Sequence, residues 1–222
     1  MELRVVSYNI RNGHDVHHDM SLLANDILAV QADIVGLQEV DVGTLRVQGR
    51  DTLAELAAAA GFAHYRFCRA IDFAGGGYGT AILCRFPILS FESTPLPTPP
   101  GAEGRAIGHA VLDVNGQRVD FFNTHLSYES AKARSLQFDA IAAQLQRYQA
   151  WVLTADFNTA DLDCFGVFGK ASLANPGRYA TFPDTGEGID NILCSGAWRI
   201  RDTGTLQNHH SDHLLLWAEL TL

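Results

Sequence analysis

The chain has 222 residues, of which 47% are hydrophobic and 18% are charged. This composition is typical of a folded globular protein and excludes a disordered chain, and the length allows a single domain, residues 1–222, with a sizeable core. The net charge is −9, from 16 basic and 25 acidic side chains. Because proteins that hold long nucleic acids usually need a basic face to replace phosphate counterions, we expect no stable nucleic-acid complex.

Four cysteines lie far apart in the sequence, each in or beside an apolar stretch: Cys68, Cys84, Cys164 and Cys194. Their spacing matches neither a zinc site nor a redox pair, so we expect buried free thiols, which fit a reducing compartment. No apolar run reaches the length of a membrane span, and the first residues lack the basic and then apolar pattern of a signal peptide. We therefore predict a cytoplasmic protein without a membrane span, and we expect a monomer.

The first half of the chain predicts strands interrupted by two helices. Residues 3–9 alternate and are rich in valine, and residues 33–40 are almost continuously apolar, as in buried strands. Between them, residues 21–31 carry leucine and isoleucine at helical spacing. A second helix begins at Asp51, a typical N-cap residue, and is closed by Gly61. Further strands are predicted at residues 62–71, 80–84 and 88–91.

The second half predicts an irregular loop, a hairpin, one long helix and several short strands. The loop, residues 93–104, holds four prolines. Strands at residues 105–114 and 117–123 meet at Asn115-Gly116, a strong hairpin turn signal. The longest helical pattern covers residues 129–149, and short strands follow at residues 151–155, 189–194, 198–205 and 213–220. Two rounds of strands, each with helices, predict an α/β fold in which two mixed sheets pack face to face with helices outside: a four-layer αββα sandwich.

Polar residues stand at six strand ends, where they cannot serve an apolar core. Taken singly, each would more often be a turn or cap residue than a functional one. Their repetition is the specific signal, because loops at one edge of a rigid sheet are where reacting groups are usually mounted. These residues are Asn9, Glu39, His125, Asp156 with Asn158, Asp190, and Asp212 with His213.

In this order, the motifs resemble those of the endonuclease/exonuclease/phosphatase superfamily, which includes pancreatic-type deoxyribonucleases, abasic-site endonucleases, neutral sphingomyelinases and inositol polyphosphate phosphatases. The resemblance extends from Tyr8 to His213, and its most specific parts are Ala155-Asp156-Phe157-Asn158 and Ser211-Asp212-His213. It implies the αββα sandwich and a divalent cation, Mg²⁺ or Mn²⁺. Glu39 would be the principal metal ligand, with Asn9 beside it, while Asp212 would contribute to that metal or to a second one.

The resemblance also implies roles for the remaining residues. Asp156 and Asn158 would position and activate the water and bind the phosphate, and Asp190 would orient His213. His125 resembles the extra histidine of the deoxyribonuclease and sphingomyelinase branches, and Asp72 is a candidate to orient it. Arg105 resembles a phosphate-contacting arginine of some branches, although an exposed charge at a strand end explains it equally well.

Elementary chemistry agrees with this assignment. A hard cation prefers oxygen ligands such as Glu, Asp and Asn, and asparagine can donate to phosphate oxygens without adding negative charge. The sequence therefore predicts a metal-dependent hydrolase of phosphoester bonds, a phosphodiesterase or phosphatase acting on a small or lipid-derived phosphoester. A DNA or RNA nuclease is the first alternative. A non-catalytic phosphate-binding module is the second, and the complete set of candidate catalytic residues disfavours it.

Overall fold

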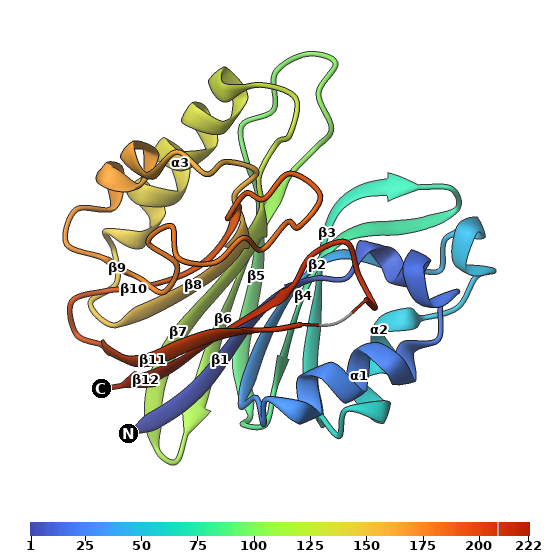
Figure 1. Ribbon diagram of the computed structural model, residues 1–222, viewed down its shortest axis with the longest axis horizontal. Coiled ribbons are helices and arrows are strands. Elements are labelled where there is room, and N and C mark those ends of the chain that lie inside the picture. Colours follow the sequence, from blue (N-terminus) through green and yellow to red (C-terminus); the bar gives the residue numbers. More distant parts are fainter. Residues whose placement is uncertain (208) are drawn as a thin grey trace.

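The computed structural model describes residues 1–207 and 209–222 of the chain. Its strands form two six-stranded mixed sheets that pack face to face, and the α-helices lie on the outer faces, α1 and α2 on one side and α3 on the other (Figure 1). The two ends of the chain lie close together, where β1 and the last strand, β12, pair side by side (Figure 1). The predicted αββα sandwich is confirmed.

The first sheet has the strand order β11-β12-β1-β2-β4-β3. Its strands are β1 (Glu2–Asn9), β2 (Ile34–Val42), β3 (His64–Phe73), β4 (Gly76–Cys84), β11 (Arg199–Leu206) and β12 (Leu215–Thr221). Helices α1 (Met20–Ala29) and α2 (Thr52–Ala59) pack on its outer face through one apolar cluster. The Asp51 side chain accepts a hydrogen bond from the Ala54 amide, so the predicted N-cap of α2 is confirmed.

The second sheet has the strand order β5-β6-β7-β8-β10-β9. Its strands are β5 (Ile88–Pro95), β6 (Ala106–Val114), β7 (Gln117–His125), β8 (Trp151–Asp156), β9 (Ser172–Leu173) and β10 (Asp190–Cys194). Helix α3 (Ala131–Leu145) and the 3₁₀ segment η3 (Leu162–Phe168) cover its outer face. Asn115 and Gly116 both have positive φ, 54° and 87°, which closes the predicted β6–β7 hairpin with the twist that antiparallel strands favour.

The apolar core between the two sheets determines where the polar strand ends gather. Alternate residues of each strand point into it, including Val5 of β1, Ile34 of β2, Phe121 of β7 and Val152 of β8. Burying each such side chain contributes about 1.5–3 kcal/mol relative to leaving it exposed. Because successive residues of a strand point to opposite faces, the residues two and four positions further along these strands line the same interface. At the edge of the sandwich where β1, β7 and β8 end, these residues are polar, and this edge holds the candidate site.

Several details differ from the sequence-based expectations. The short strand β9 and the segment η3 were not predicted, because neither has a sustained hydrophobic period. Strand β4 begins at Gly76 rather than at residue 80, since the glycines pair with β3 in place of forming a loop. All four cysteines are free as predicted, but Cys164 is only partly buried. Among the described residues, every helix is too short or too polar to cross a membrane.

Candidate active site

An open pocket of about 240 Å³ lies at the edge of the sandwich where β1, β7 and β8 end. The carboxyl ends of neighbouring parallel strands meet at one edge of a sheet, and β1–β2 and β7–β8 are the two parallel pairs. Seven of the nine predicted site residues line the pocket: Glu39, Arg105, His125, Asp156, Asn158, Asp212 and His213. The other two, Asn9 and Asp190, are buried and hydrogen-bond to lining residues.

Glu39 reaches the pocket through an irregularity in β2. The pairing of β2 with β4 shifts between Leu37 and Val40, so that Gln38 and Glu39 together face a single residue of β4, and Glu39 has a positive φ of 55°. Such a bulge redirects side chains. Val35, Leu37 and Val40 all pack toward the outer helices, whereas strict alternation would have sent Glu39 there as well. The bulge turns its carboxylate toward Asn9 and the pocket instead.

Asn9 links Glu39, which comes from the first sheet, to Asp156, which comes from the second. Its Nδ2 lies 3.1 Å from Glu39 Oε1 and 3.0 Å from Asp156 Oδ2, and donates to both. Burial raises the pKa of Glu39, and the nearby negative charge of Asp212 raises it further against the effect of Asn9. Asp212 faces Arg11, whose Nε lies 3.3 Å from Oδ2. The negative charges of Glu39 and Asp212 are therefore only partly offset by positively charged groups of the chain.

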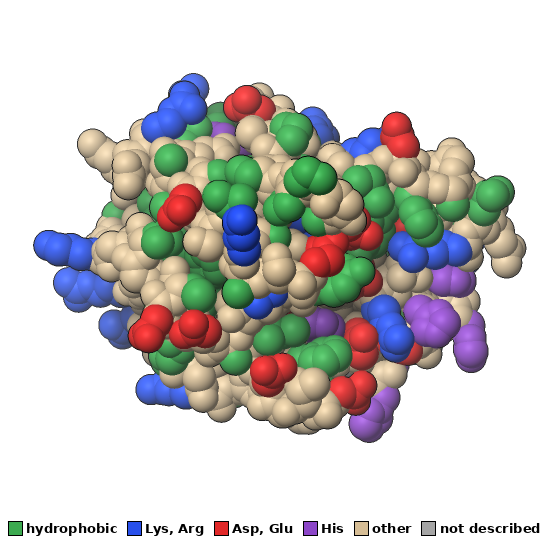
Figure 2. Space-filling model, turned by 90° about the horizontal axis from the view of Figure 1, so that it is seen from above, with side chains coloured by type: hydrophobic (Ala, Val, Ile, Leu, Met, Phe, Trp, Pro, Cys, Tyr) green, Lys and Arg blue, Asp and Glu red, His purple; other side chains and the backbone are tan. Residues whose placement is uncertain are grey.

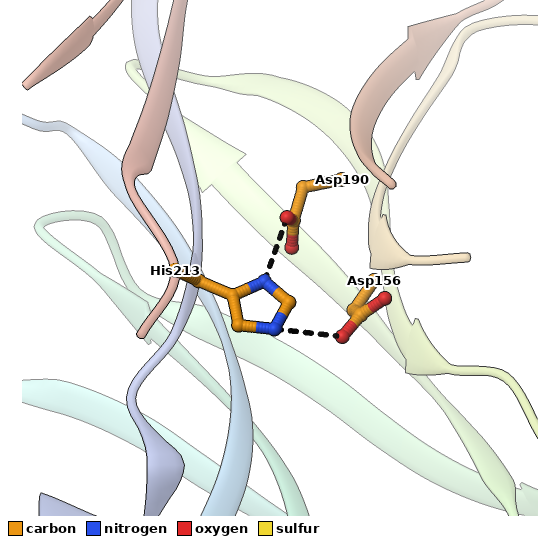
Figure 3. A group of neighbouring side chains, drawn as sticks. All are labelled: Asp156, Asp190 and His213. Carbon is orange, nitrogen blue, oxygen red and sulfur yellow. Dashed lines mark hydrogen bonds and ion pairs between the residues drawn. The ribbon is translucent and has the colours of Figure 1, made fainter. Parts of the chain in front are cut away.

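His213 lies between two carboxylates, as Figure 3 shows. Its Nδ1 is 2.8 Å from Asp190 Oδ2, and its Nε2 is 3.7 Å from Asp156 Oδ2. Burial alone would lower the pKa of His213, but Asp190 and then Asp156 outweigh it and raise the pKa to about 10. The expected contact between Asp190 and His213 is present, while the orienting role of Asp190 stays a prediction. The raised pKa favours a protonated His213 ring at neutral pH.

Asp156 is the carboxylate shared by both histidines. Burial, followed by the negative charge of Asp190 on the neighbouring strand, raises its pKa to about 7. Its Oδ1 accepts from the backbone amide of Asn158, 2.9 Å away, and its Oδ2 accepts from Asn9. A carboxylate whose pKa lies near 7, beside a protonated histidine, is suited to taking a proton from water.

His125 has the opposite environment. Arg105 Nη1 lies 3.1 Å from its Nδ1, and a guanidinium can only donate, so Nδ1 is the acceptor and the proton of the neutral ring sits on Nε2. The Nε2–H can donate to Asp156 Oδ2, 3.4 Å away. The Asn158 Nδ2, 2.8 Å from Nε2, is itself a donor, to the Leu126 carbonyl oxygen, so in this tautomer the contact between the two nitrogens is not a hydrogen bond. Burial, and then the positive charge of Arg105, lower the pKa of His125 well below its usual value. His125 is therefore neutral at physiological pH.

Two sequence-based expectations for this half of the site are corrected. Asp72 does not orient His125: it pairs with Arg69, and 86% of its side chain is exposed. The reading of Arg105 as an exposed strand-end charge is also wrong, because Arg105 is 4% exposed. Its guanidinium contacts Glu103 and His125, while its buried Nε has no hydrogen-bond partner within the described residues.

The sequence did not identify the aromatic walls of the pocket. Tyr78, Tyr128 and Phe182 line it, and the Phe182 ring lies 4.9 Å from the ring of His213. Tyr128 is 65% exposed and follows the motif of His125 by three positions, while Tyr78 follows directly on the glycines that begin β4. Burial raises the pKa of Tyr78, so its phenol stays protonated. Proximity to a motif was the one available signal for Tyr78 and Tyr128, and Phe182 lies in an irregular stretch that gave none.

The donor set at the edge of the pocket fits a hard divalent cation. Glu39, Asn9 and Asp212 supply carboxylate and amide oxygens, which Mg²⁺ and Mn²⁺ prefer. Within the described residues the Glu39 carboxylate has one side-chain hydrogen bond, from Asn9. Burial and the charge of Asp212 raise its pKa, so its ionised form is poorly stabilised by the chain, and a bound cation would stabilise it. A second group, Asp156, Asp190 and His213, also brings potential ligand atoms within 4.8 Å of one another, but there Asp190 and His213 already bind each other.

Comparisons with known proteins agree with this geometry. The model of the endonuclease/exonuclease/phosphatase family matches residues 6–213. The chain belongs to this family. It is also 34% identical over 118 residues to the protein cwh43 of Schizosaccharomyces pombe, a match that covers 51% of this chain but only 11% of that protein, so the chain spans about a tenth of the length of its curated relative.

Two solved structures from Bacteroides thetaiotaomicron have the same fold. One is an endonuclease/exonuclease/phosphatase family protein, 22% identical, with a TM-score of 0.82 over 99% of this chain and 97% of that chain. The other is a mannosyl-6-phosphatase, 21% identical, with a TM-score of 0.82 over 99% of this chain and all of that chain. At these identities the likeness establishes the fold, and the family match establishes a phosphoester hydrolase family.

Proposed function

We propose that the protein hydrolyses a phosphoester with the help of a divalent cation, as a phosphodiesterase or phosphatase for a small or lipid-derived substrate. One observation carries the proposal. His213, held by the Asp190 carboxylate, and His125, held by the Arg105 guanidinium, flank one carboxylate, Asp156, in the same open pocket as Glu39. This arrangement provides an acid, a base, neutral donors and a cation site within one cavity.

In the proposed reaction, the bond from phosphorus to the water oxygen forms as the bond from phosphorus to the leaving oxygen breaks. The leaving oxygen keeps the bonding electron pair and takes a proton from solvent, so the products are an alcohol and a phosphate. Asp156, held by Asn9 and the Asn158 amide, takes the proton of the attacking water. His213, kept protonated by Asp190, stabilises negative charge that develops on the phosphoryl group. The bound cation would be held by Glu39, Asn9 and Asp212, and would supply electrostatic stabilisation of the phosphate.

The remaining residues would bind the substrate. Arg105, Asn158 and the Nε2–H side of His125 face the pocket from its other half and are suited to donating to phosphate oxygens. Tyr78 adds a protonated phenol. None of these donors brings additional negative charge to a site that must accept an anion.

Metal dependence is tested by chelation and by one matched pair of variants. We expect EDTA to abolish hydrolysis and Mg²⁺ or Mn²⁺ to restore it. Glu39→Gln should weaken Mn²⁺ binding, measured by calorimetry, while Glu55→Gln should not, because Glu55 is a surface residue of α2 paired with Arg50. Full activity after exhaustive chelation would contradict the proposed mechanism.

The substrate is proposed from the pocket and tested by a screen. A pocket of about 240 Å³ with tyrosine and phenylalanine walls suits a compact headgroup. The screen compares bis-para-nitrophenyl phosphate, a phosphomonoester such as mannose 6-phosphate, phospholipid headgroup esters, and plasmid DNA. We expect turnover of a small or lipid-derived ester to exceed that of DNA. A preference for plasmid DNA would support the nuclease alternative, and no turnover of any substrate would support the phosphate-binding module.

The distribution of charge favours the small substrate over DNA. On the face shown in Figure 2, acidic side chains are interspersed with those of lysine and arginine, so no continuous basic strip crosses it. The chain has two lysines, Lys132 and Lys170, and a net charge of −9. We expect affinity for duplex DNA of about micromolar or weaker at physiological salt, the range of non-specific contacts. Nanomolar binding with a steep salt dependence would promote the nuclease.

We further propose that residues 1–222 act as one domain and as a monomer in a reducing compartment such as the cytoplasm. The shared core between the two sheets supports the first proposal, and the free cysteines support the last. Sedimentation of the purified protein at several concentrations tests the oligomeric state.

A further inference from the structure

A layer of buried polar side chains lies directly beneath the candidate site, at the top of the apolar core between the sheets. Four side chains make it up, each with 0% exposure, and each comes from a different strand: Ser7 of β1, Gln38 of β2, Asn123 of β7 and Thr154 of β8. They are hydrogen-bonded to one another. Asn123 Oδ1 accepts from Gln38 Nε2 at 2.8 Å and from Thr154 Oγ1 at 3.0 Å, and Gln38 Nε2 also lies 3.2 Å from Ser7 Oγ.

The position of this layer in the sequence is regular. Ser7, Asn123 and Thr154 each precede a candidate site residue by two positions: Asn9, His125 and Asp156, respectively. In a strand, residues two apart point to the same face, so each site residue stands directly above a member of the layer. Gln38 departs from this rule by one position, because the bulge in β2 lets Gln38 and Glu39 follow each other on this side.

Asn123 is the centre of the layer and reaches across to the other sheet. Its Nδ2 donates to the carbonyl oxygens of Leu37 and Ala81, both at 2.8 Å. Leu37 and Ala81 are the last pair of the β2–β4 ladder before the register shifts at the bulge. Both amide hydrogens of Asn123 therefore hold the two strands at the point where the bulge that carries Glu39 begins.

The chain also makes room for this contact. A Cβ atom at Gly36 would lie 1.9 Å from Thr154 Oγ1 and 2.7 Å from Asn123 Oδ1, so any larger residue would displace the layer. A buried polar network is costly where a member lacks a partner, and Gln38 Oε1 has no hydrogen-bond partner among the described residues. A polar layer retained at this cost supports a geometric role for it beneath the site.

We propose that Asn123 is a positioning residue for the cation site: through the polar layer and the bulge in β2, it sets where Glu39 stands relative to Asn9 and Asp156. The inference rests on the proposed function. It states that Asn123, a residue of the second sheet, fixes the position of the Glu39 carboxylate, which belongs to the first sheet. Groups that hold metal ligands in place typically change metal affinity about 10–100-fold when they are removed. Since Asn123 acts through the backbone of β2, we expect the lower end of that range.

A pair of threonine variants tests the inference with matched chemistry. Thr154→Val removes the hydroxyl that donates to Asn123, whereas Thr124→Val removes one that donates to the Ala106 carbonyl at 2.9 Å, from the opposite face of β7. Both threonines have 0% exposure. The Thr154 hydroxyl lies near a second acceptor, the Phe122 carbonyl oxygen at 3.3 Å, but each hydroxyl has one proton, so each change deletes one donated hydrogen bond. Asn123→Leu removes the centre of the layer at similar volume. The readouts are Mn²⁺ binding by electron paramagnetic resonance and thermal unfolding in EDTA, neither of which needs turnover.

We expect Thr154→Val and Thr124→Val to lower the melting temperature similarly, and only Thr154→Val to weaken Mn²⁺ binding, by a few-fold. Asn123→Leu, if it folds, should weaken Mn²⁺ binding about tenfold. Equal Mn²⁺ affinity in the wild type and in Thr154→Val, or equal weakening in the two threonine variants, would overturn the inference while leaving the proposed function intact. Failure of the wild type itself to bind Mn²⁺ would instead refute the proposed function.

Discussion

The two halves of the pocket hold the same kind of side chain in opposite states. In one half His213 is bound by Asp190, which raises its pKa to about 10 against the effect of burial. In the other half, His125 is bound by Arg105, and burial together with that positive charge lowers its pKa. Both rings are about equally buried, so the difference comes from the partner and not from exposure.

This contrast shows how one residue type can serve two purposes in a single site. A histidine held by a carboxylate keeps its proton and presents a positive charge, while a histidine held by a guanidinium remains neutral and binds by its N–H. Asp156 stands between them, 3.4 Å from Nε2 of His125 and 3.7 Å from Nε2 of His213. The charge on each side of Asp156 therefore depends on the partner of each histidine: Asp190, which lies behind the pocket wall, and Arg105, which lines the pocket.

The largest expected effect is the loss of either ring. Replacing His213 with Ala should cut turnover by roughly 10²–10⁴-fold, the usual range for a positioned acid–base group, and we expect His125→Ala to fall in the same range but nearer its lower end. Steady-state kinetics and melting temperatures of both variants measure this. Near-normal turnover in His213→Ala would refute the mechanism. If His125→Ala lowered only the melting temperature, His125 would be a filler of the pocket wall.

A smaller effect is expected from the group behind His213. Asp190→Asn keeps the shape but removes the charge that raises the pKa of His213, so that pKa should fall. If protonated His213 is the active form, activity in the wild type is retained until the pH approaches about 10 and is lost above it. In Asp190→Asn the loss should begin at lower pH, and turnover at neutral pH should fall roughly 10–100-fold.

A double-mutant cycle sharpens this prediction. If Asp190 acts mainly through His213, Asp190→Asn should cost much less in a His213→Ala background than in the wild type, and the remaining cost would reflect its charge beside Asp156. Asp190→Asn combined with His125→Ala should be closer to additive. An unchanged pH profile in Asp190→Asn would show that His213 is not the group whose proton matters.

The corresponding change in the other half is Arg105→Gln. Losing the guanidinium removes a positive charge that lowers the pKa of His125, so that pKa should rise. A hydrogen bond to a charged group contributes about 1.5–3 kcal/mol, so kcat/KM should fall roughly tenfold or more. The His125 ring proton shifts in an NMR titration measure the first effect, and kinetics measure the second. A His125 pKa that stays put would show that burial alone keeps the ring neutral.

Most of the site followed from the sequence because strand ends are visible in it. Asn9, His125 and Asp156 each end an alternating or apolar run, and parallel neighbours bring such ends together. The sequence placed Glu39 at the edge of the sheet where the structure has it, but the direction of its side chain could not be predicted. Strict alternation would point Glu39 at the outer helices, and the bulge that redirects it has no signature in a single sequence.

The partners of the two histidines divide in the same way. Asp190 was matched to His213 by motif order, and the geometry agrees. For His125 the sequence suggested a carboxylate partner, Asp72, and the structure has Arg105 there instead. Asn123 lies inside a motif, but its contacts could not be predicted, since the partners of a polar residue within a buried strand come from strands that are distant in the sequence.

The smallest expected effect comes from Asp72→Asn. Both nitrogens of His125 already face partners, Arg105 on one side and Asp156 on the other, so no nitrogen remains for Asp72. Asp72 lies on β3, an edge strand, with 86% of its side chain exposed and Arg69 as its ion-pair partner. Exposed substitutions of this kind usually change stability by about 0.5 kcal/mol or less. Turnover should therefore stay within about twofold of the wild type, and the pKa of His125 should not move.

Arg69→Gln, which removes the other member of the same surface pair, is the matched control. A marked fall in turnover with a shifted His125 pKa in Asp72→Asn, but not in Arg69→Gln, would mean that Asp72 reaches the histidine in solution and that the two halves of the pocket are both held by carboxylates.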